Sequence, residues 1–113
     1  AVGSFRMGWL RDEVRLRRYE RSLVLLDELD SPEGEYYRGE LYRLRRDEGD
    51  DKRAERAYKS AVARGRAPNE TFRSLGLVYR RLGDEAAMRS AFETYLAKEP
   101  EASDRAIIES YLR

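Results

Sequence analysis

Cysteine and histidine are both absent from the 113 residues of this sequence, and proline occurs only three times. Without Cys and His there can be no disulfide framework, no zinc site built from these residues, no thiol nucleophile and no imidazole general base. Long apolar runs are lacking as well, since none approaches the 18 or so residues that span a bilayer. We therefore expect no membrane span and none of these catalytic classes.

An excess of charge of one sign is also lacking. Charged residues make up 40% of the chain, but 23 basic residues face 22 acidic ones. A nucleic-acid binder usually has an unbalanced basic face, because neutralising phosphates needs net positive charge. Here the two signs alternate closely, which is typical of solvated helix faces. We expect an elongated helical protein with no nucleic-acid partner. Binding of RNA or anionic lipid through arginine-rich turns is the less favoured alternative.

The three prolines divide the chain at a near-constant period. Pro32, Pro68 and Pro100 lie 36 and 32 residues apart. Because proline ends helices, and because periods of this length are typical of repeat proteins, we expect a single domain of stacked units. Four segments result: a weakly patterned one over 1–31, a unit over 32–68, the clearest unit over 69–100 and a terminal helix over 101–113.

The clearest unit is predicted to be a helix-turn-helix hairpin. Residues at three- and four-residue steps form its first stripe: Phe72, Leu75, Gly76, Tyr79 and Leu82. Gly83 and Asp84 then break the pattern, as a helix C-cap and the N-cap of a second helix. That helix carries a second stripe: Ala87, Met88, Ala91, Phe92, Tyr95 and Leu96. Gly76 costs about 1 kcal/mol relative to Ala in mid-helix, so we expect its missing Cβ to let another helix lie close.

This order of residues resembles the tetratricopeptide repeat, whose pattern opens W-x2-L-G-x2-Y and closes with F and P. Phe72 stands where the family often has Trp, and Met88 and Tyr95 stand where it prefers alanine. The resemblance implies an all-α fold, a right-handed superhelix of antiparallel helix hairpins. With two to three repeats and a capping helix, about seven helices are expected.

The unit over 32–68 resembles the same repeat more loosely. Gly39 and Tyr42 match its first helix. A small, aromatic, small triplet matches the second helix: Ala54, Tyr58 and Ala61. The charged segment over 45–51 is about three residues longer than the usual turn, so we expect an extended hairpin tip. Arg38 occupies a position where leucine is expected.

The two ends of the chain lie outside the two units that match the repeat, and the N-terminal end matches its pattern least. Residues 1–31 fit either a weak first repeat, with helices from Phe5 to about Leu16 and from about Tyr19, or one long helix from Trp9 to Asp30. After Pro100, Ser103 or Asp104 can cap the last helix, which in repeat proteins covers the open face of the final unit. The chain lacks an initiator Met, so we expect a piece of a longer protein, cytoplasmic or periplasmic.

The resemblance implies that the first helix of each repeat lines a concave groove that receives a peptide or helix of a partner protein. Carried over by position, the partner-binding residues are Tyr36, Glu40, Arg43, Arg73, Leu77 and Arg80. Tyr36 and Tyr37 are neighbours about 100° apart on a helix, so only one of them can face a given interface. Arginines near helix C-termini, such as Arg43 and Arg80, either interact with the helix dipole or pair with an acidic peptide.

No constellation in the sequence predicts catalysis, a cofactor or a metal site. The acidic residues around Gly49 lack the spacing of a calcium loop. No pair of carboxylates falls in an apolar setting, and glycine-rich phosphate loops are missing. We expect a non-catalytic protein-binding module. The alternative is an accessory or dimerisation domain of a larger, envelope-associated enzyme. Self-association through an N-terminal face around Phe5 and Trp9 is a further expectation.

Overall fold

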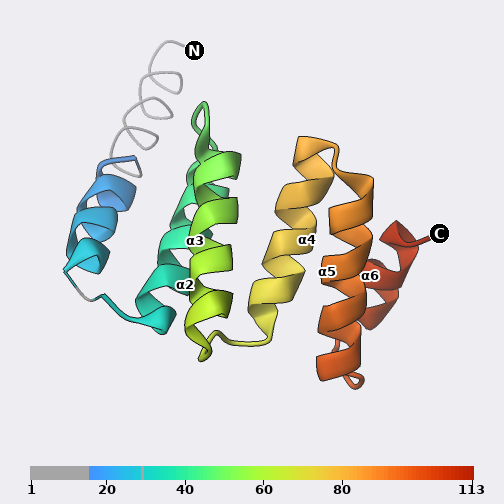
Figure 1. The fold of residues 1–113 in the computed structure, drawn as a ribbon. Coiled ribbons are helices and arrows are strands. Elements are labelled where there is room, and N and C mark those ends of the chain that lie inside the picture. Colours follow the sequence, from blue (N-terminus) through green and yellow to red (C-terminus); the bar gives the residue numbers. More distant parts are fainter. Residues whose placement is uncertain (1–15, 29) are drawn as a thin grey trace, which may run out of the picture.

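The computed structural model describes residues 16–28 and 30–113, and within these ranges every regular element is a helix (Figure 1). One helix covers residues 16–27. The others are α2 (Pro32–Arg45), α3 (Asp50–Arg64), α4 (Glu70–Leu82), α5 (Glu85–Lys98) and α6 (Arg105–Tyr111). The all-α prediction is therefore confirmed. About seven helices were expected and the described residues contain six, because the first expected helix lies almost wholly outside them, as do Phe5 and Trp9.

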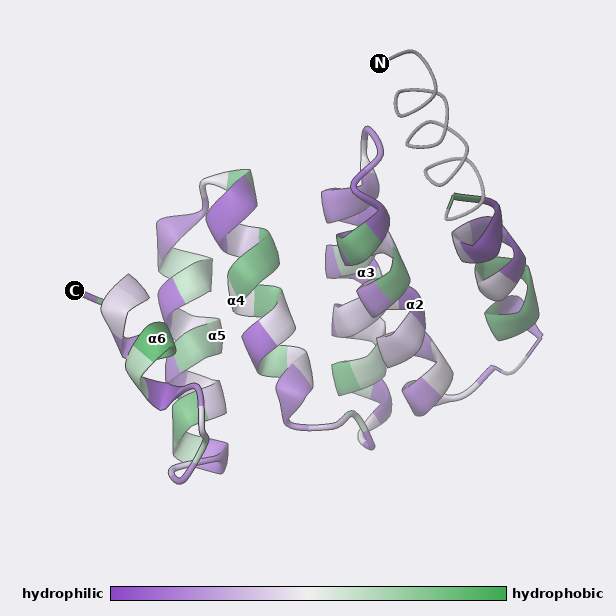
Figure 2. Ribbon diagram, turned by 180° about the vertical axis from the view of Figure 1, so that it is seen from behind, coloured by the Kyte–Doolittle hydropathy of each residue, from purple (hydrophilic) through white to green (hydrophobic). Residues whose placement is uncertain are grey.

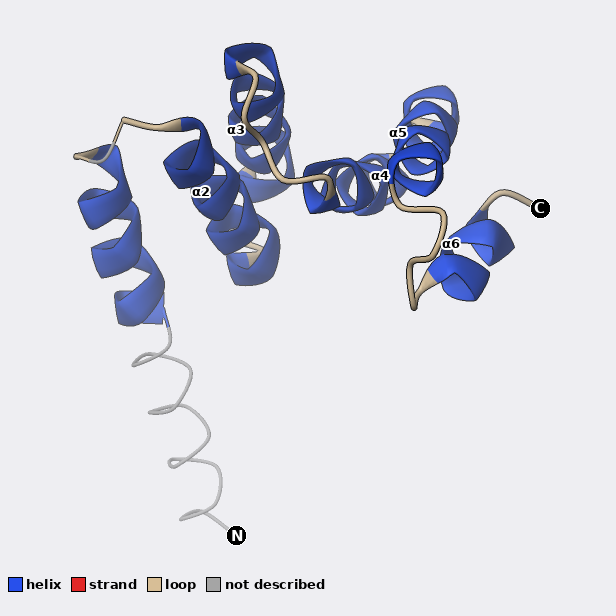
Figure 3. Cartoon of the chain, turned by 90° about the horizontal axis from the view of Figure 1, so that it is seen from below, coloured by secondary structure: helices blue, strands red, loops and turns tan. Residues whose placement is uncertain are grey.

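The helices form a row of antiparallel hairpins. α2 pairs with α3 and α4 with α5, while α3 packs against α4 to join the two hairpins (Figure 1). Seen from below, α3 and α5 lie on one side of the row and α2 and α6 on the other, with α4 between them (Figure 3). The result is elongated, with extents of 48 × 36 × 25 Å. Among the described residues, no helix is both long and apolar enough to cross a membrane.

Capping residues set the helix ends. The Ser31 side chain accepts a 3.0 Å hydrogen bond from the Gly34 amide, and Pro32 supplies a preset φ at the start of α2. α4 ends at Gly83, whose φ of 79° suits a residue without a Cβ. The Asp84 side chain then accepts from the Ala87 amide at 3.1 Å and starts α5. The turn predicted at Gly83 and Asp84 is thus confirmed.

A buried ion cluster closes the tip of the first hairpin. The connection between α2 and α3 is only Arg46–Gly49, because α3 already begins at Asp50. The Asp50 side chain is fully buried, and its carboxylate accepts two hydrogen bonds from Arg45, at 2.8 and 2.9 Å, and one from Arg53 at 2.9 Å. The Asp47 amide adds a fourth at 3.0 Å. Because these four hydrogen bonds converge on one buried carboxylate, the charged sequence forms an ordered turn. Its four connecting residues are two more than those between α4 and α5.

Each hairpin is held by a glycine packed on an aromatic ring. A Cβ on Gly39 would lie 2.5 Å from Cε1 of Tyr58, and a Cβ on Gly76 would clash in the same way with the ring of Phe92. Tyr58 and Phe92 are both fully buried. The close approach predicted for Gly76 is therefore confirmed, and Gly39 has the same role.

Hydrophobic residues gather more on α4, α5 and α6 than on α2 and α3 (Figure 2).

Candidate functional site

Glu40 is the centre of a polar cluster that joins α2, α3 and α4. Its Oε1 accepts hydrogen bonds from the Tyr58 hydroxyl at 2.6 Å and from the Ser74 hydroxyl at 2.5 Å. Its Oε2 accepts from Nη2 of Arg43 at 3.0 Å. The cluster brings together residues 18 and 34 positions apart in the chain. It ties the first hairpin to the second across their adjoining first helices.

The contacts within the cluster shift the pKa values of Glu40 and Tyr58 in opposite directions. Burial alone would raise the pKa of Glu40, but hydrogen bonds from Arg43, Ser74 and Tyr58 outweigh it and lower the pKa below the ordinary value. Burial and the adjoining Glu40 carboxylate raise the pKa of Tyr58. Glu40 is therefore an anion and Tyr58 a neutral donor at neutral pH. The hydrogen bond between this anion and this neutral donor joins α2 to α3.

A second cluster joins α4 to α6. Arg73 donates to Asp104 at 3.3 Å, and its guanidinium lies 5.9 Å from the ring centre of Tyr95. The Tyr95 hydroxyl also donates to Asp104, at 2.8 Å. Ser103 or Asp104 was expected to cap the last helix. Asp104 stands at the N-cap position, but its side chain makes no capping hydrogen bond, because both carboxylate oxygens serve this cluster.

Four of the six predicted partner-binding residues lie in two joints between helices. Glu40 and Arg43 come together in the first, beside α4, and Arg73 and Arg80 reach the second, beside α6. The guanidinium of Arg80 lies 4.4 Å from the ring centre of Tyr111. Arg80 is exposed and Leu77 is half-buried. Contact of these residues with a partner stays a prediction.

Tyr36 and Tyr37 diverge as predicted from helix geometry. Tyr36 is 9% exposed, and its ring centre lies 6.1 Å from that of Tyr58. Tyr37 is 56% exposed. Tyr36 is therefore part of the core at the edge of the Glu40 cluster, and Tyr37 is the member of the pair that faces solvent.

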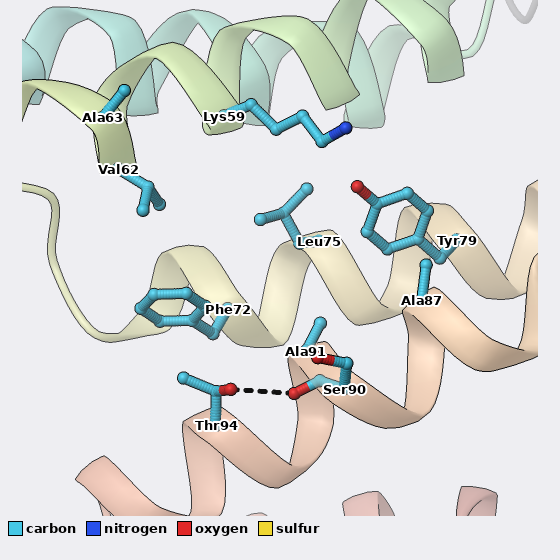
Figure 4. Close-up of a pocket in the computed structure, with 10 residues that line it drawn as sticks. All are labelled: Lys59, Val62, Ala63, Phe72, Leu75, Tyr79, Ala87, Ser90, Ala91 and Thr94. Carbon is cyan, nitrogen blue, oxygen red and sulfur yellow. Dashed lines mark hydrogen bonds between the residues drawn. The ribbon is translucent and has the colours of Figure 1, made fainter.

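An apolar cavity of about 320 Å³, which was not predicted from the sequence, lies on the other side of the row. α4 forms its floor, and α3 and α5 form its walls (Figure 4). The side chains that line it are Lys59, Val62, Ala63, Phe72, Leu75, Tyr79, Ala87, Ser90, Ala91 and Thr94. The available signal was Val62 and Ala63, two apolar residues that continue α3 beyond the matched triplet.

The first hairpin has a matching cavity of the same size, about 320 Å³. It is lined by Glu35, Arg38, Tyr42, Arg53, Arg56, Ala57 and Ser60. Superposing Gly39 on Gly76 and Tyr58 on Phe92 turns these positions, in order, into Phe72, Leu75, Tyr79, Ala87, Ser90, Ala91 and Thr94. All seven line the apolar cavity. The two hairpins are thus equivalent residue by residue, but one cavity is charged and the other apolar.

A third cavity, of about 440 Å³, extends the apolar one toward the turn between α4 and α5. The two share Tyr79, and the third is lined besides by Lys52, Glu55, Leu82, Gly83, Asp84 and Glu85. We call these two adjoining cavities together the α3/α5 groove. One end of it is apolar, and the other end is lined by three carboxylates. Glu55 pairs with Lys52 and Lys59, and Glu85 pairs with Arg89, so Asp84 is the carboxylate there without an ion pair of 4 Å or less to any residue that the structure describes.

These features define the class of the molecule as an all-helical protein of repeated antiparallel hairpins. No family model, no curated protein and no solved structure matches the chain, so the comparisons do not assign it to a particular family within this class.

Proposed function

We propose that the chain is a tetratricopeptide-like right-handed superhelix that works as a non-catalytic module, binding a peptide or helix of a partner protein. The observation that carries the proposal is the equivalence of the two hairpins, with a glycine beneath a buried aromatic ring in each. Units that repeat in this way bury their faces against one another and leave an extended surface along the row. Binding is the activity for which such a surface is suited.

The proposed binding surface is the concave side formed by the first helix of each unit. The Glu40 and Asp104 clusters fix the spacing of α2, α4 and α6 there, which supports a preorganised surface. Arg43 and Arg73 retain 19% and 31% exposure of their side chains, and Arg80 is exposed. Guanidinium groups pair with carboxylates in a bidentate geometry, so an acidic segment with an apolar residue opposite Leu77 suits this surface.

Site-specific photo-crosslinking tests the proposal. A photo-reactive side chain at position 77 is expected to capture a partner in producing cells, and the adduct is identified by mass spectrometry. Arg80→Glu should reduce the adduct at least tenfold, because it reverses the charge beside the probe. Arg66→Glu, at an exposed position between α3 and α4, is the matched control. Equal adduct yields from a probe at Ala97, or no effect of Arg80→Glu, would contradict the proposal.

A further inference from the structure

The two ends of the α3/α5 groove differ in chemistry, and this difference restricts what can bind in it. Its apolar end is built on Phe72 and Leu75, and its acidic end lies beside Leu82, with Asp84 and Glu85 at the turn. Leu75 and Leu82 are seven residues apart on α4, or about 10 Å at the rise of an α-helix. The apolar cavity of about 320 Å³ has room for about ten waters, or for two aliphatic side chains in their place. An occupant needs an apolar end and a basic end two helical turns apart.

The helix over residues 16–27 of this chain has such a face. Val24 and Leu25 are 61% and 60% exposed, which is unusual for adjacent large apolar residues. Arg21, and Arg17 and Arg18 one turn earlier, are also exposed. Because Arg18, Arg21 and Leu25 follow a three- and four-residue spacing, they share one side of the helix. Leu25 and Arg18 are seven residues apart, the same two turns that separate the two ends of the groove.

We propose that the helix over 16–27 of one copy binds in the α3/α5 groove of a second copy. Val24 and Leu25 enter the apolar end, and the arginines meet Asp84 and Glu85 at the acidic end. This is recognition of an amphipathic helix in a groove. Within one chain the contact is blocked, because this helix lies against α2 through the 2.7 Å ion pair of Asp27 with Arg38, with α3 between it and the groove (Figure 1).

The proposed contact joins two different surfaces, so it is heterologous. Each bound copy still presents a free groove at one end and a free helix at the other, and association continues into a ring or an open chain rather than stopping at a symmetric dimer. The surface involved lies on the α3 and α5 side of the row (Figure 3). Partner binding on the concave side is therefore a separate event, and the two proposals can fail independently.

Sedimentation velocity over a range of concentrations tests the proposal on the 113-residue chain. Leu25→Glu should weaken association at least tenfold, because it places a charge in the apolar end. Ile107→Glu is its matched control, since Ile107 is 59% exposed on α6, away from the groove. Ala63→Arg should have the same effect from the groove side, and its control is Ala97→Arg, at an exposed position of α5 that does not line the groove.

Mixing the two variants gives the sharper test. The Leu25→Glu chain keeps an intact groove and the Ala63→Arg chain keeps an intact helix. Each alone is expected to be monomeric, and an equimolar mixture is expected to form a 1:1 dimer that does not grow further. A chain that is monomeric at every concentration, or variants that associate as their controls do, would overturn the proposal. So would a mixture that stays monomeric, and the groove would then be open to a different protein.

Discussion

The hydroxyl of Ser74 donates a 2.5 Å hydrogen bond to the carboxylate of Glu40, 34 residues earlier in the chain, and so links the first helices of two successive hairpins. The same oxygen of Glu40 accepts from Tyr58 of α3. One carboxylate thereby fixes three helices, and because it is a charged acceptor, each bond is worth more than a neutral one.

Glu40→Gln should therefore destabilise the protein. Hydrogen bonds to charged groups contribute roughly 1.5–3 kcal/mol each, and an amide keeps only part of that. We expect the free energy of unfolding in urea to fall by about 2 kcal/mol. Glu93→Gln, at an exposed position of α5, should change it by less than about 0.5 kcal/mol. Equal effects of the two substitutions would show that the cluster contributes nothing.

Stability should fall in acid because two carboxylates titrate at lowered pKa values. Burial would raise the pKa of Glu40 and of Asp50, but hydrogen bonds outweigh burial in both and hold each pKa below its ordinary value of 4.5 or 3.8. A carboxylate with a lowered pKa in the folded protein stabilises it above the ordinary value, and that contribution is lost as the pH falls through the folded value. Unfolding free energies should be level from pH 7 to about 5 and drop below about 4.

The Glu40→Gln variant separates the two carboxylates in this titration. It should retain only the part of the acid drop that belongs to Asp50 and the other carboxylates, so its curve is flatter than that of the parent. A variant curve parallel to the parent down to pH 3 would exclude Glu40 as a contributor.

Gly76→Ala should destabilise the second hairpin, against the helix propensity of the two residues. In an exposed helix this change stabilises by about 1 kcal/mol, but here the new Cβ would meet the ring of Phe92. Overpacking of this kind costs roughly 1–3 kcal/mol. The control is Phe92→Leu, alone and combined with Gly76→Ala. If the contact is the cause, the double variant loses less than the sum of the single losses.

Tyr111→Ala should release α6 without unfolding the hairpins. The Tyr111 ring stacks on Phe92 with centres 5.6 Å apart and planes 18° apart, and the guanidinium of Arg80 lies 4.4 Å from the centre of the Tyr111 ring. Hydrogen exchange of α6 amides should quicken at least tenfold, whereas amides of α2 and α3 keep their protection. Ser110→Ala, at the neighbouring exposed position, is the control. Uniform loss of protection along the chain would contradict this local role.

The second hairpin could be predicted from the sequence because residues close together in the chain determine its two helices and the turn between them. The break at Gly83 and Asp84 and the apolar stripes of α4 and α5 can be read from the spacing of residues alone. The packing of Gly76 on a neighbouring helix also followed, since a glycine in mid-helix needs a compensating contact.

The surroundings of the candidate site could not be predicted in the same way. Position along a helix indicated that Glu40 and Arg73 share a side, but not that Ser74 and Asp104 would stand opposite them. Those partners are set by how far one hairpin is shifted along the next, which depends on packing of the whole interface. Asp104 illustrates the limit, because its position favours a helix cap while Tyr95 and Arg73 occupy its carboxylate.

The paired cavities also needed three dimensions, because each draws its walls from two or three helices. Their equivalence separates framework from recognition. The set of side chains at the seven equivalent positions is largely charged in the first hairpin and largely apolar in the second. The contact between a glycine and an aromatic ring that holds each hairpin is the same in both. Transferring the seven lining residues of one hairpin to the other should therefore transfer the binding preference of its cavity as well.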